Sequence, residues 1–310
     1  IPLMAKGIGP GDAVITTSFS YIATAEVIAF LGATPIFCDI YQNTFNLDPN
    51  GLEEAYNKAV LKGLKPKAVI SVDLFGLPAR YRLIDEFTKS KNLFLLEDAA
   101  QGFGGKIGKQ KACTFGDVSA TSFFPAKPLG GYGDGGAIFT NNDKLAEKMR
   151  SIRVHGGGKD KYDNIRLGLN GRLDTLQAAV LIEKLGIFDS EIRKRNKIAK
   201  IYEENLNTQF TKPYIPKNYI SSWAQYSIIL SSEKQRIKAI EVLTKNKIPN
   251  MIYYKIPLHI QKTFKYLGYK KGSFPISESV SNRILSLPMH PYLDIRDQNF
   301  INDTLNSLEI

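Results

Sequence analysis

The chain contains an apolar run, Leu93-Phe94-Leu95-Leu96, that continues into Glu97-Asp98-Ala99-Ala100-Gln101. An apolar run bounded by turn residues predicts a strand that is buried on both faces. Such a strand brings Asp98 to the carboxyl end of a sheet, where an unpaired carboxylate is costly and needs a cationic or donor partner. Taken alone, the motif is equally compatible with a helix cap or a structural ion pair at Asp98.

Other short apolar or β-branched runs predict further strands of the same sheet, at residues 13–17, 34–38, 68–72, 118–122 and 137–140. Helical patterns lie between them, at residues 23–31, 52–61 and 81–89. Strands that alternate with helices predict an α/β fold with a mostly parallel sheet and helices on both faces. Ligands of such sheets bind just beyond the carboxyl ends of the strands.

The length of 310 residues suggests two domains, at roughly 150 residues each. The alternation ends near Asp174, where an amphipathic stretch at 174–187 and a charged segment at 191–197 predict a connecting helix. The remaining runs predict a smaller C-terminal α+β domain, with elements at 223–230, 233–245 and 251–254. We therefore expect a large domain at 1–188 and a small domain at 189–310.

Composition excludes several classes of protein. The 41 basic and 30 acidic residues give a net charge of +11, but most of the basic residues are Lys spread through helical stretches, so we expect no nucleic-acid partner. No apolar run approaches the ~18 residues of a membrane span. Cys38 and Cys113 are too few for a disulfide framework, and His155, His259 and His290 are too far apart for a metal motif. We expect a cytoplasmic protein without a metal ion.

A second chemical motif is Thr121-Ser122-Phe123-Phe124-Pro125-Ala126-Lys127-Pro128-Leu129-Gly130-Gly131. A lysine flanked by prolines and followed by a glycine pair lies in a shaped loop, which here follows the 118–122 strand. A desolvated lysine has a lowered pKa and becomes an amine nucleophile that forms Schiff bases. The glycines at 131–136 lead into a strand and not a helix, so they predict a tight turn and no dinucleotide site.

These motifs, at 97–101, 122–127 and 132–136, resemble those of the DegT/DnrJ/EryC1/StrS family of sugar aminotransferases, which are pyridoxal-phosphate enzymes of fold type I. The likeness extends over essentially the whole chain, with further motifs at 7–12, 20–25, 169–179 and 256–259. The family has several dozen residues before the position of Gly7, including a Ser-Gly-Thr segment that binds the cofactor phosphate. We therefore expect the polypeptide to be incomplete at its start.

The resemblance implies that pyridoxal phosphate is the cofactor and that Lys127 holds it covalently as a Schiff base. Asp98 then pairs with the pyridinium nitrogen, and Gln101 lies near the ring hydroxyl. Ser122 matches a position that contacts the cofactor phosphate. Tyr21 matches an aromatic residue that stacks on the ring, although core packing also accounts for an aromatic side chain at that helix start.

The resemblance also implies an assembly. Asn170 matches a residue that family members supply from the neighbouring subunit to the cofactor phosphate, and Arg172 lies beside it on the same loop. A homodimer with shared active sites follows. Related sequences often carry His-Tyr-Pro where this chain has Tyr253-Tyr254-Lys255, so only Tyr254 matches there.

Segments 124–134, 153–156 and 170–174 look most like enzymes that aminate C3 of a UDP-linked 3-keto-N-acetylhexosaminuronic acid with glutamate as donor, in the synthesis of surface-polysaccharide precursors. The implied substrate contacts are Arg172, His155, Tyr254 and His259. The basic loop at 159–166 suits an acidic diphosphate substrate, although generic surface charge has the same appearance.

Three alternatives stay open. A C4 aminotransferase, or one that uses a dTDP-keto sugar, has the same core motifs. A deoxysugar dehydratase on this scaffold carries His in place of the Schiff-base lysine, and Lys127 argues against it. A non-catalytic regulator is expected to lose Asp98 or Lys127, and both are present.

Overall fold

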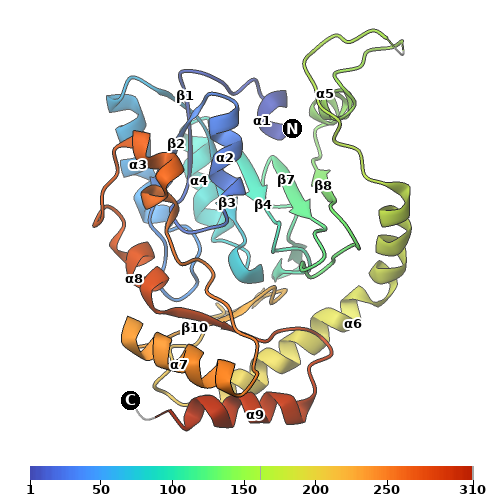
Figure 1. The fold of residues 1–310 in the computed structure, drawn as a ribbon. Helices are drawn as coiled ribbons and strands as arrows, with labels where there is room; N and C mark the ends of the chain where they lie inside the picture. The colour runs from blue at the N-terminus through green and yellow to red at the C-terminus, as the bar shows by residue number, and fades with distance from the viewer. Residues whose placement is uncertain (161, 309–310) are drawn as a thin grey trace.

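The computed structural model describes residues 1–160 and 162–308 and is built around a six-stranded sheet with strand order β2-β1-β3-β4-β7-β8 (Figure 1). The strands are β1 (Asp12–Thr17), β2 (Thr34–Cys38), β3 (Lys65–Val72), β4 (Phe94–Asp98), β7 (Val118–Ser122) and β8 (Gly136–Phe139). Strands β1, β2, β3, β4 and β7 pair in parallel, whereas β8 is antiparallel to β7. The predicted α/β class with a mostly parallel sheet is confirmed.

Helices cover both faces of the sheet because alternate strand residues point to opposite sides. On one face, Ile15 and Val69 pack with residues of α3 (Leu52–Leu61) and α4 (Tyr81–Ser90). On the other face, Val14 and Ile70 pack with residues of the helices α1 (Pro2–Ala5), α2 (Ala23–Phe30) and α5 (Asp143–Arg153). The sheet is therefore buried on both sides, and the polar side chains that a ligand can reach lie at the ends of its strands.

The connecting helix α6 (Thr175–Asn205) is 31 residues long and runs from the large domain to the small one (Figure 1). The predicted amphipathic stretch and charged segment are thus parts of one helix, and residue 189 lies inside it. Leu181 and Phe188 pack with the loop after β7, whereas Ile198 and Tyr202 belong to the small-domain core. The helix therefore contributes to both cores, and the boundary at 189 stays a prediction.

The small domain is built on a two-stranded antiparallel sheet, β10 (Tyr226–Ile229) with β11 (Ile284–Leu287). Its helices are α7 (Glu233–Lys245), α8 (Pro275–Arg283) and α9 (Ile295–Asn306). A second small sheet joins β5 (Lys106–Ile107), β6 (Gln110–Lys111) and β9 (Tyr219–Ile220). Because β9 follows α6 in the chain and β5 precedes it, this sheet ties the two halves of the protein together.

The segment between α5 and α6 projects from the body of the molecule (Figure 1). Two isolated bridges fold it back on itself, Val154 to Asn170 and Gly157 to Asn164. Lys161, in the predicted basic loop, lies outside the described residues.

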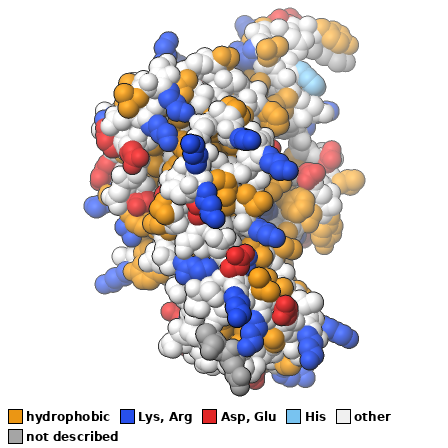
Figure 2. Space-filling model, turned by 60° about the vertical axis from the view of Figure 1, so that its left-hand side comes forward, with side chains coloured by type: hydrophobic (Ala, Val, Ile, Leu, Met, Phe, Trp, Pro, Cys, Tyr) orange, Lys and Arg blue, Asp and Glu red, His pale blue; other side chains and the backbone are white. Residues whose placement is uncertain are grey.

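Lys and Arg side chains are scattered over the face shown in Figure 2 and do not form a single stripe. Within residues 1–160 and 162–308, no helix combines the length and apolar composition needed to cross a bilayer. In the same residues, no group of His, Cys, Asp and Glu side chains is arranged to hold a metal ion. Cys38 and Cys113 are unpaired and buried.

Candidate active site

Asp98 is the last residue of β4, where the run of buried apolar side chains ends. Its Oδ2 accepts a hydrogen bond from Thr24 Oγ1 of α2 at 2.8 Å, and its Oδ1 accepts one from Ala100 N at 3.2 Å. The Asp98 side chain is partly accessible. Burial raises the pKa of its carboxyl group, and the hydrogen bonds from Thr24 and Ala100 lower that pKa by less. A carboxyl group in this position gains most from a cationic partner, because a positive charge offsets the desolvation.

Lys127 lies in the loop between β7 and β8, where Lys127 N donates to Phe124 O at 2.8 Å and closes a turn. Burial lowers the pKa of Lys127, and the nearby charge of Asp98 opposes this effect. The two residues singled out from the sequence are therefore close enough to interact electrostatically. A lysine with a lowered pKa has a larger neutral fraction and is the better nucleophile.

Helix α6 holds the lysine loop in place. Lys184 Nζ donates to Gly130 O at 2.5 Å, and Gln177 Oε1 accepts from Tyr132 N at 2.7 Å. Close packing requires glycine at position 130, because an added Cβ would collide with Pro125 O. The shape of the loop, and with it the position of Lys127, therefore depends on the first turns of α6.

Gln101 joins the large domain to Tyr254. Gln101 Oε1 accepts from Phe75 N at 2.6 Å, which fixes the orientation of the amide. Gln101 Nε2 then donates to the Tyr254 hydroxyl at 3.0 Å. Because the Tyr254 oxygen accepts this bond, its own proton remains available to donate to another group. Burial raises the pKa of Tyr254, so the hydroxyl keeps that proton at neutral pH.

Aromatic rings form one side of this cluster. The Tyr254 ring centroid lies 5.8 Å from that of Phe19, 6.5 Å from that of Phe75 and 6.4 Å from that of Tyr21. Tyr21 is 59% exposed, so its ring is available to a planar ligand. Ring contacts and the Gln101 hydrogen bond thus bring Tyr21, Gln101 and Tyr254 together, as the sequence predicts for residues of one site.

Ser122 is the last residue of β7, the strand next to β4 in the sheet. Its Oγ accepts from Phe124 N at 3.2 Å, which leaves its hydroxyl proton free to donate. Ser122 therefore lies where the loop that carries Lys127 leaves the sheet.

Pyridoxal phosphate, the cofactor that the sequence resemblance implies, fits this cluster. Asp98 needs a cationic partner, and a protonated ring nitrogen is one. Lys127, whose pKa is lowered by burial, would offer its amine to the aldehyde carbon. The exposed Tyr21 ring and the Ser122 hydroxyl offer a flat surface and a hydrogen-bond donor for the ring and the phosphate.

Thr24 is a site residue that the sequence analysis did not single out. Its hydroxyl bonds Asp98 and also lies 3.2 Å from Ser20 Oγ. Thr24 lies within the motif at 20–25, but its contact with Asp98 joins α2 to β4, and no local pattern in the sequence shows it.

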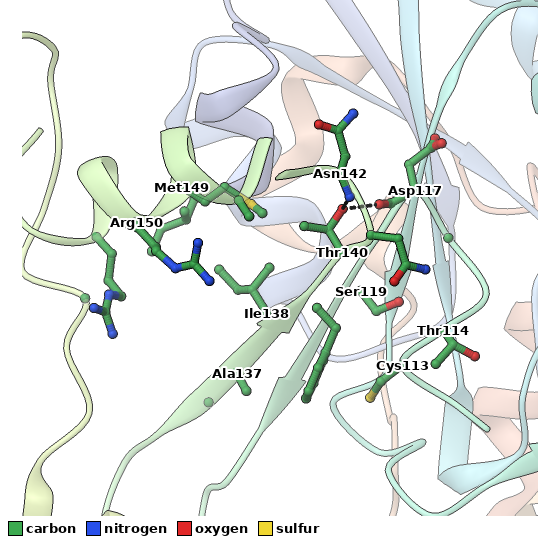
Figure 3. A pocket seen from close by; sticks show the side chains of 18 of the residues that line it. Cys113, Thr114, Asp117, Ser119, Ala137, Ile138, Thr140, Asn142, Met149 and Arg150 are labelled. Carbon is green, nitrogen blue, oxygen red and sulfur yellow. Dashed lines mark hydrogen bonds between the residues drawn. The ribbon is translucent and has the colours of Figure 1, made fainter. Parts of the chain in front are cut away.

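Asn170, Arg172 and His155 lie on the projecting segment. Arg172 Nε donates to Asn170 Oδ1 at 3.0 Å, and all three side chains are exposed. Arg172 lines a groove of about 960 Å³ along the edge strand β8 and helix α5 (Figure 3). Asp98 and Lys127 do not line this groove. Within the described part of a single chain, the side chains of these three residues make no hydrogen bond to Asp98 or Lys127.

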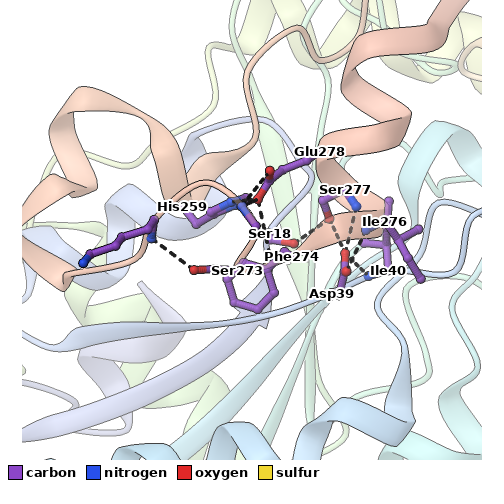
Figure 4. Close-up of polar contacts among 11 residues, drawn as sticks. Ser18, Asp39, Ile40, His259, Ser273, Phe274, Ile276, Ser277 and Glu278 are labelled. Carbon is purple, nitrogen blue, oxygen red and sulfur yellow. Dashed lines mark hydrogen bonds and ion pairs between the residues drawn. The ribbon is translucent and has the colours of Figure 1, made fainter. Parts of the chain in front are cut away.

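The structure corrects the prediction for His259. Its side chain is 0% exposed, with Nε2 bonded to Glu278 Oε1 at 2.9 Å and the ring packed on Phe274, so it has no surface to offer a substrate (Figure 4). Glu278 lies in α8, whose N-terminus is capped by Asp39 of the large domain through Ile276 N at 3.0 Å. The position is that of a packing residue at the contact between the two domains.

The chain resembles known proteins over nearly its whole length. A model of the DegT/DnrJ/EryC1/StrS aminotransferase family matches residues 1–306. The chain is 43% identical over 292 residues to UDP-2-acetamido-2-deoxy-3-oxo-D-glucuronate aminotransferase of Pseudomonas aeruginosa, covering 94% of this chain and 78% of the relative. It is 42% identical over 305 residues to a pleiotropic regulatory protein of Geobacillus stearothermophilus, covering 97% and 79%.

Among solved structures, the crystal structure of a DegT DnrJ EryC1 StrS aminotransferase from Brucella abortus superposes with a TM-score of 0.94 at 48% sequence identity, covering 98% of this chain and 81% of that one. This likeness confirms the predicted fold type I. The predicted cofactor is confirmed by the family, whose aminotransferases use pyridoxal phosphate. The chain belongs to the DegT/DnrJ/EryC1/StrS aminotransferase family and is a pyridoxal-phosphate-dependent nucleotide-sugar aminotransferase.

Proposed function

We propose that this enzyme transfers the amino group of glutamate to C3 of a UDP-linked N-acetyl-3-ketohexosaminuronic acid, as a step toward surface-polysaccharide precursors in the cytoplasm. The observation that supports this chemistry is the pairing of Asp98 with Lys127 in one cluster. Burial raises the pKa of the Asp98 carboxyl group and lowers the pKa of the Lys127 amine. The observation that supports this substrate is the likeness to the Pseudomonas aeruginosa oxo-glucuronate aminotransferase.

When bound, pyridoxal phosphate supplies the electron sink that makes removal of a proton from the amino-bearing carbon possible. Asp98 holds the proton on the ring nitrogen, and its bonds from Thr24 and Ala100 keep the carboxylate aimed at that position. Lys127 would hold the cofactor, and its amine would move the proton from the carbon that loses the amino group to the carbon that gains it.

The remaining residues of the cluster bind and orient. We assign Tyr21 to stacking on the ring, Gln101 to the ring hydroxyl and Ser122 to the phosphate. The Tyr254 hydroxyl, with its proton free to donate, is assigned to the sugar substrate. None of these groups needs to change its protonation state during the reaction.

We further propose a homodimer in which Asn170 and Arg172 complete the partner's site. Exposed apolar side chains on and around the projecting segment support this, since a monomer rarely leaves so many in one region. They are Tyr132 at 78%, Leu167 at 89%, Leu176 at 79% and Ile182 at 66% exposure. A second copy that covers them would carry Asn170, Arg172 and His155 toward the other Asp98–Lys127 cluster.

The likeness to transaminases named for dTDP-linked 3-amino sugars favours one second candidate, a dTDP-linked keto sugar as the substrate. An assay of the purified protein with glutamate and a panel of keto nucleotide sugars separates the candidates. Turnover of a UDP-3-keto uronic acid supports the proposal. Turnover of a 4-keto or dTDP sugar alone moves the assignment to that substrate, and absence of turnover with every sugar of the panel contradicts the proposal.

A further inference from the structure

Two buried carboxyl groups lie behind Asp98. Glu97 precedes Asp98 on β4, so its side chain points away from the site, and Asp73 follows directly on the neighbouring strand β3. Both residues are 0% exposed. Ser71 pairs with Glu97 across the two strands, so Asp73, two residues further along, lies on the same face of the sheet, and its carboxyl group interacts with that of Glu97. Two carboxylates in contact without water repel each other strongly, so the pair needs a proton or a cation.

Both oxygens of Glu97 accept hydrogen bonds. Glu97 Oε1 accepts from Cys113 N at 2.6 Å. Glu97 Oε2 accepts from Phe115 N at 2.8 Å and from the Ser119 hydroxyl at 2.5 Å. Acceptance of three hydrogen bonds is the pattern of an ionised carboxylate.

Asp73 has a different pattern. Its Oδ1 accepts from the Tyr81 hydroxyl at 2.7 Å and from Ala79 N at 3.1 Å. Its Oδ2 is buried and receives no hydrogen bond from the described residues. One oxygen that accepts and one that has no donor is the pattern of a protonated acid, with the proton on the second oxygen.

No cation takes the place of that proton. In residues 1–160 and 162–308, no Lys or Arg forms an ion pair with either carboxyl group. The titratable groups that act on Asp73 are Glu97 of β4, Tyr81 of α4, Tyr219 of β9 and Cys113 of the loop before β7. All of them are neutral or negative at neutral pH. Burial and the charge of Glu97 accordingly raise the pKa of Asp73 well above its usual range.

We propose that Asp73 and Glu97 share one proton, and that this bridge between the ends of β3 and β4 positions Asp98 and Gln101. Asp73 N donates to Asp98 O at 3.0 Å, so the bridge is attached directly to the backbone of the site carboxylate. Asp73 also packs against Gly102, where an added Cβ would collide with Asp73 Oδ2. Gln101 is the neighbour of that glycine. Asp73 is thus a positioning residue, and this part rests on the proposed roles of Asp98 and Gln101.

Infrared spectroscopy of the cofactor-free chain at pH 7.5 tests the shared proton without any assumption about function. Wild type is expected to show the carbonyl stretch of a protonated carboxylic acid, and Asp73→Asn is expected to lose intensity there, because its amide donates to Glu97 in place of the proton. Asp303→Asn, an exposed change on α9, is the matched control and keeps the full intensity. An Asp73→Asn spectrum with undiminished acid intensity overturns the shared proton.

Cofactor binding tests the positioning. Asp73→Asn preserves the bridge and is expected to bind pyridoxal phosphate like wild type, with an unchanged absorption spectrum. Asp73→Ala removes the bridge, and its affinity is expected to fall about tenfold or more with a shifted spectrum of the bound cofactor. If Asp73→Ala binds with wild-type affinity and spectrum, the positioning role is wrong. Failure of wild type itself to bind the cofactor would instead contradict the proposed function.

Discussion

The Thr24 hydroxyl lies 2.8 Å from Oδ2 of Asp98 and donates to it across the interface between α2 and β4. A hydroxyl donor favours the ionised form of the carboxyl group, which burial disfavours. The charge that must hold a proton on the ring nitrogen therefore depends on a side chain from another element.

This relationship predicts the effect of Thr24→Val, which removes the donor at nearly constant volume. A hydrogen bond to a charged group contributes about 1.5–3 kcal/mol, so kcat is expected to fall about ten- to a hundredfold while the cofactor stays bound. Thr24→Ser keeps the donor and serves as the control. Steady-state kinetics with saturating cofactor make the comparison. Equal losses in both variants would indicate a packing role for Thr24.

Shared active sites predict complementation between two inactive chains. Lys127→Ala and Asn170→Ala are each expected to be inactive as homodimers, whereas mixed dimers carry one site with both residues intact. Activity is measured after subunit exchange, with exchange verified by mass spectrometry. Mixed dimers as inactive as the parents would show that Asn170 does not complete the partner's site.

The proposed uronic-acid substrate predicts a preference that depends on Arg172. A charge-assisted pair with the sugar carboxylate is expected to favour the acidic substrate over the neutral keto sugar by about 1.5–3 kcal/mol in kcat/KM. Arg172→Lys is expected to reduce this preference, because an ammonium group does not reproduce the planar guanidinium. Equal wild-type rates on both substrates would remove the uronic acid as the proposed substrate. A loss shared equally by both substrates in Arg172→Lys would assign the side chain to the diphosphate or the interface.

The burial of His259 predicts that the stability of the protein depends on pH. Burial lowers the pKa of His259 despite Glu278, so the folded protein resists binding a proton that the unfolded chain takes up below about pH 6.5. Stability therefore decreases as pH falls below that value, by up to about 1.4 kcal/mol per pH unit. Relative to His259→Gln, wild type is expected to lose Tm between pH 7.5 and 5. The exposed His155→Gln is the control, and parallel curves for wild type and His259→Gln would show that protonation of His259 does not limit stability.

Much of the fold could be predicted from local patterns. The strands at 34–38 and 118–122 and the helices at 52–61 and 233–245 begin and end in the structure where the sequence predicts. Strand β3 begins earlier, at Lys65. Its first three residues have no apolar alternation, and only the pairing of Lys65 and Pro66 with β1 makes them part of a strand. Where such a strand begins depends on its register with the neighbouring strand, and one stretch of sequence does not specify that register.

In the candidate site, too, some residues could be predicted from their local sequence and others could not. Asp98 and Lys127 could be predicted because the residues next to each of them in the sequence already fix its surroundings, a buried strand end for Asp98 and a loop shaped by proline and glycine for Lys127. The burial of His259 arises from contacts between segments 258–260 and 274–278, which no local pattern shows. The shared proton of Asp73 and Glu97 likewise depends on two strands lying side by side.

The covalent attachment of the cofactor offers the sharpest test of the proposed active site. The full-length protein is loaded with pyridoxal phosphate and treated with borohydride, and the modified peptide is mapped by mass spectrometry. A single reduced adduct is expected on Lys127, the lysine whose pKa is lowered by burial beside Asp98. The same treatment of Lys127→Ala is expected to give no specific adduct. An adduct on any other lysine of the wild-type chain would contradict the assignment of Lys127 and the active site built around it.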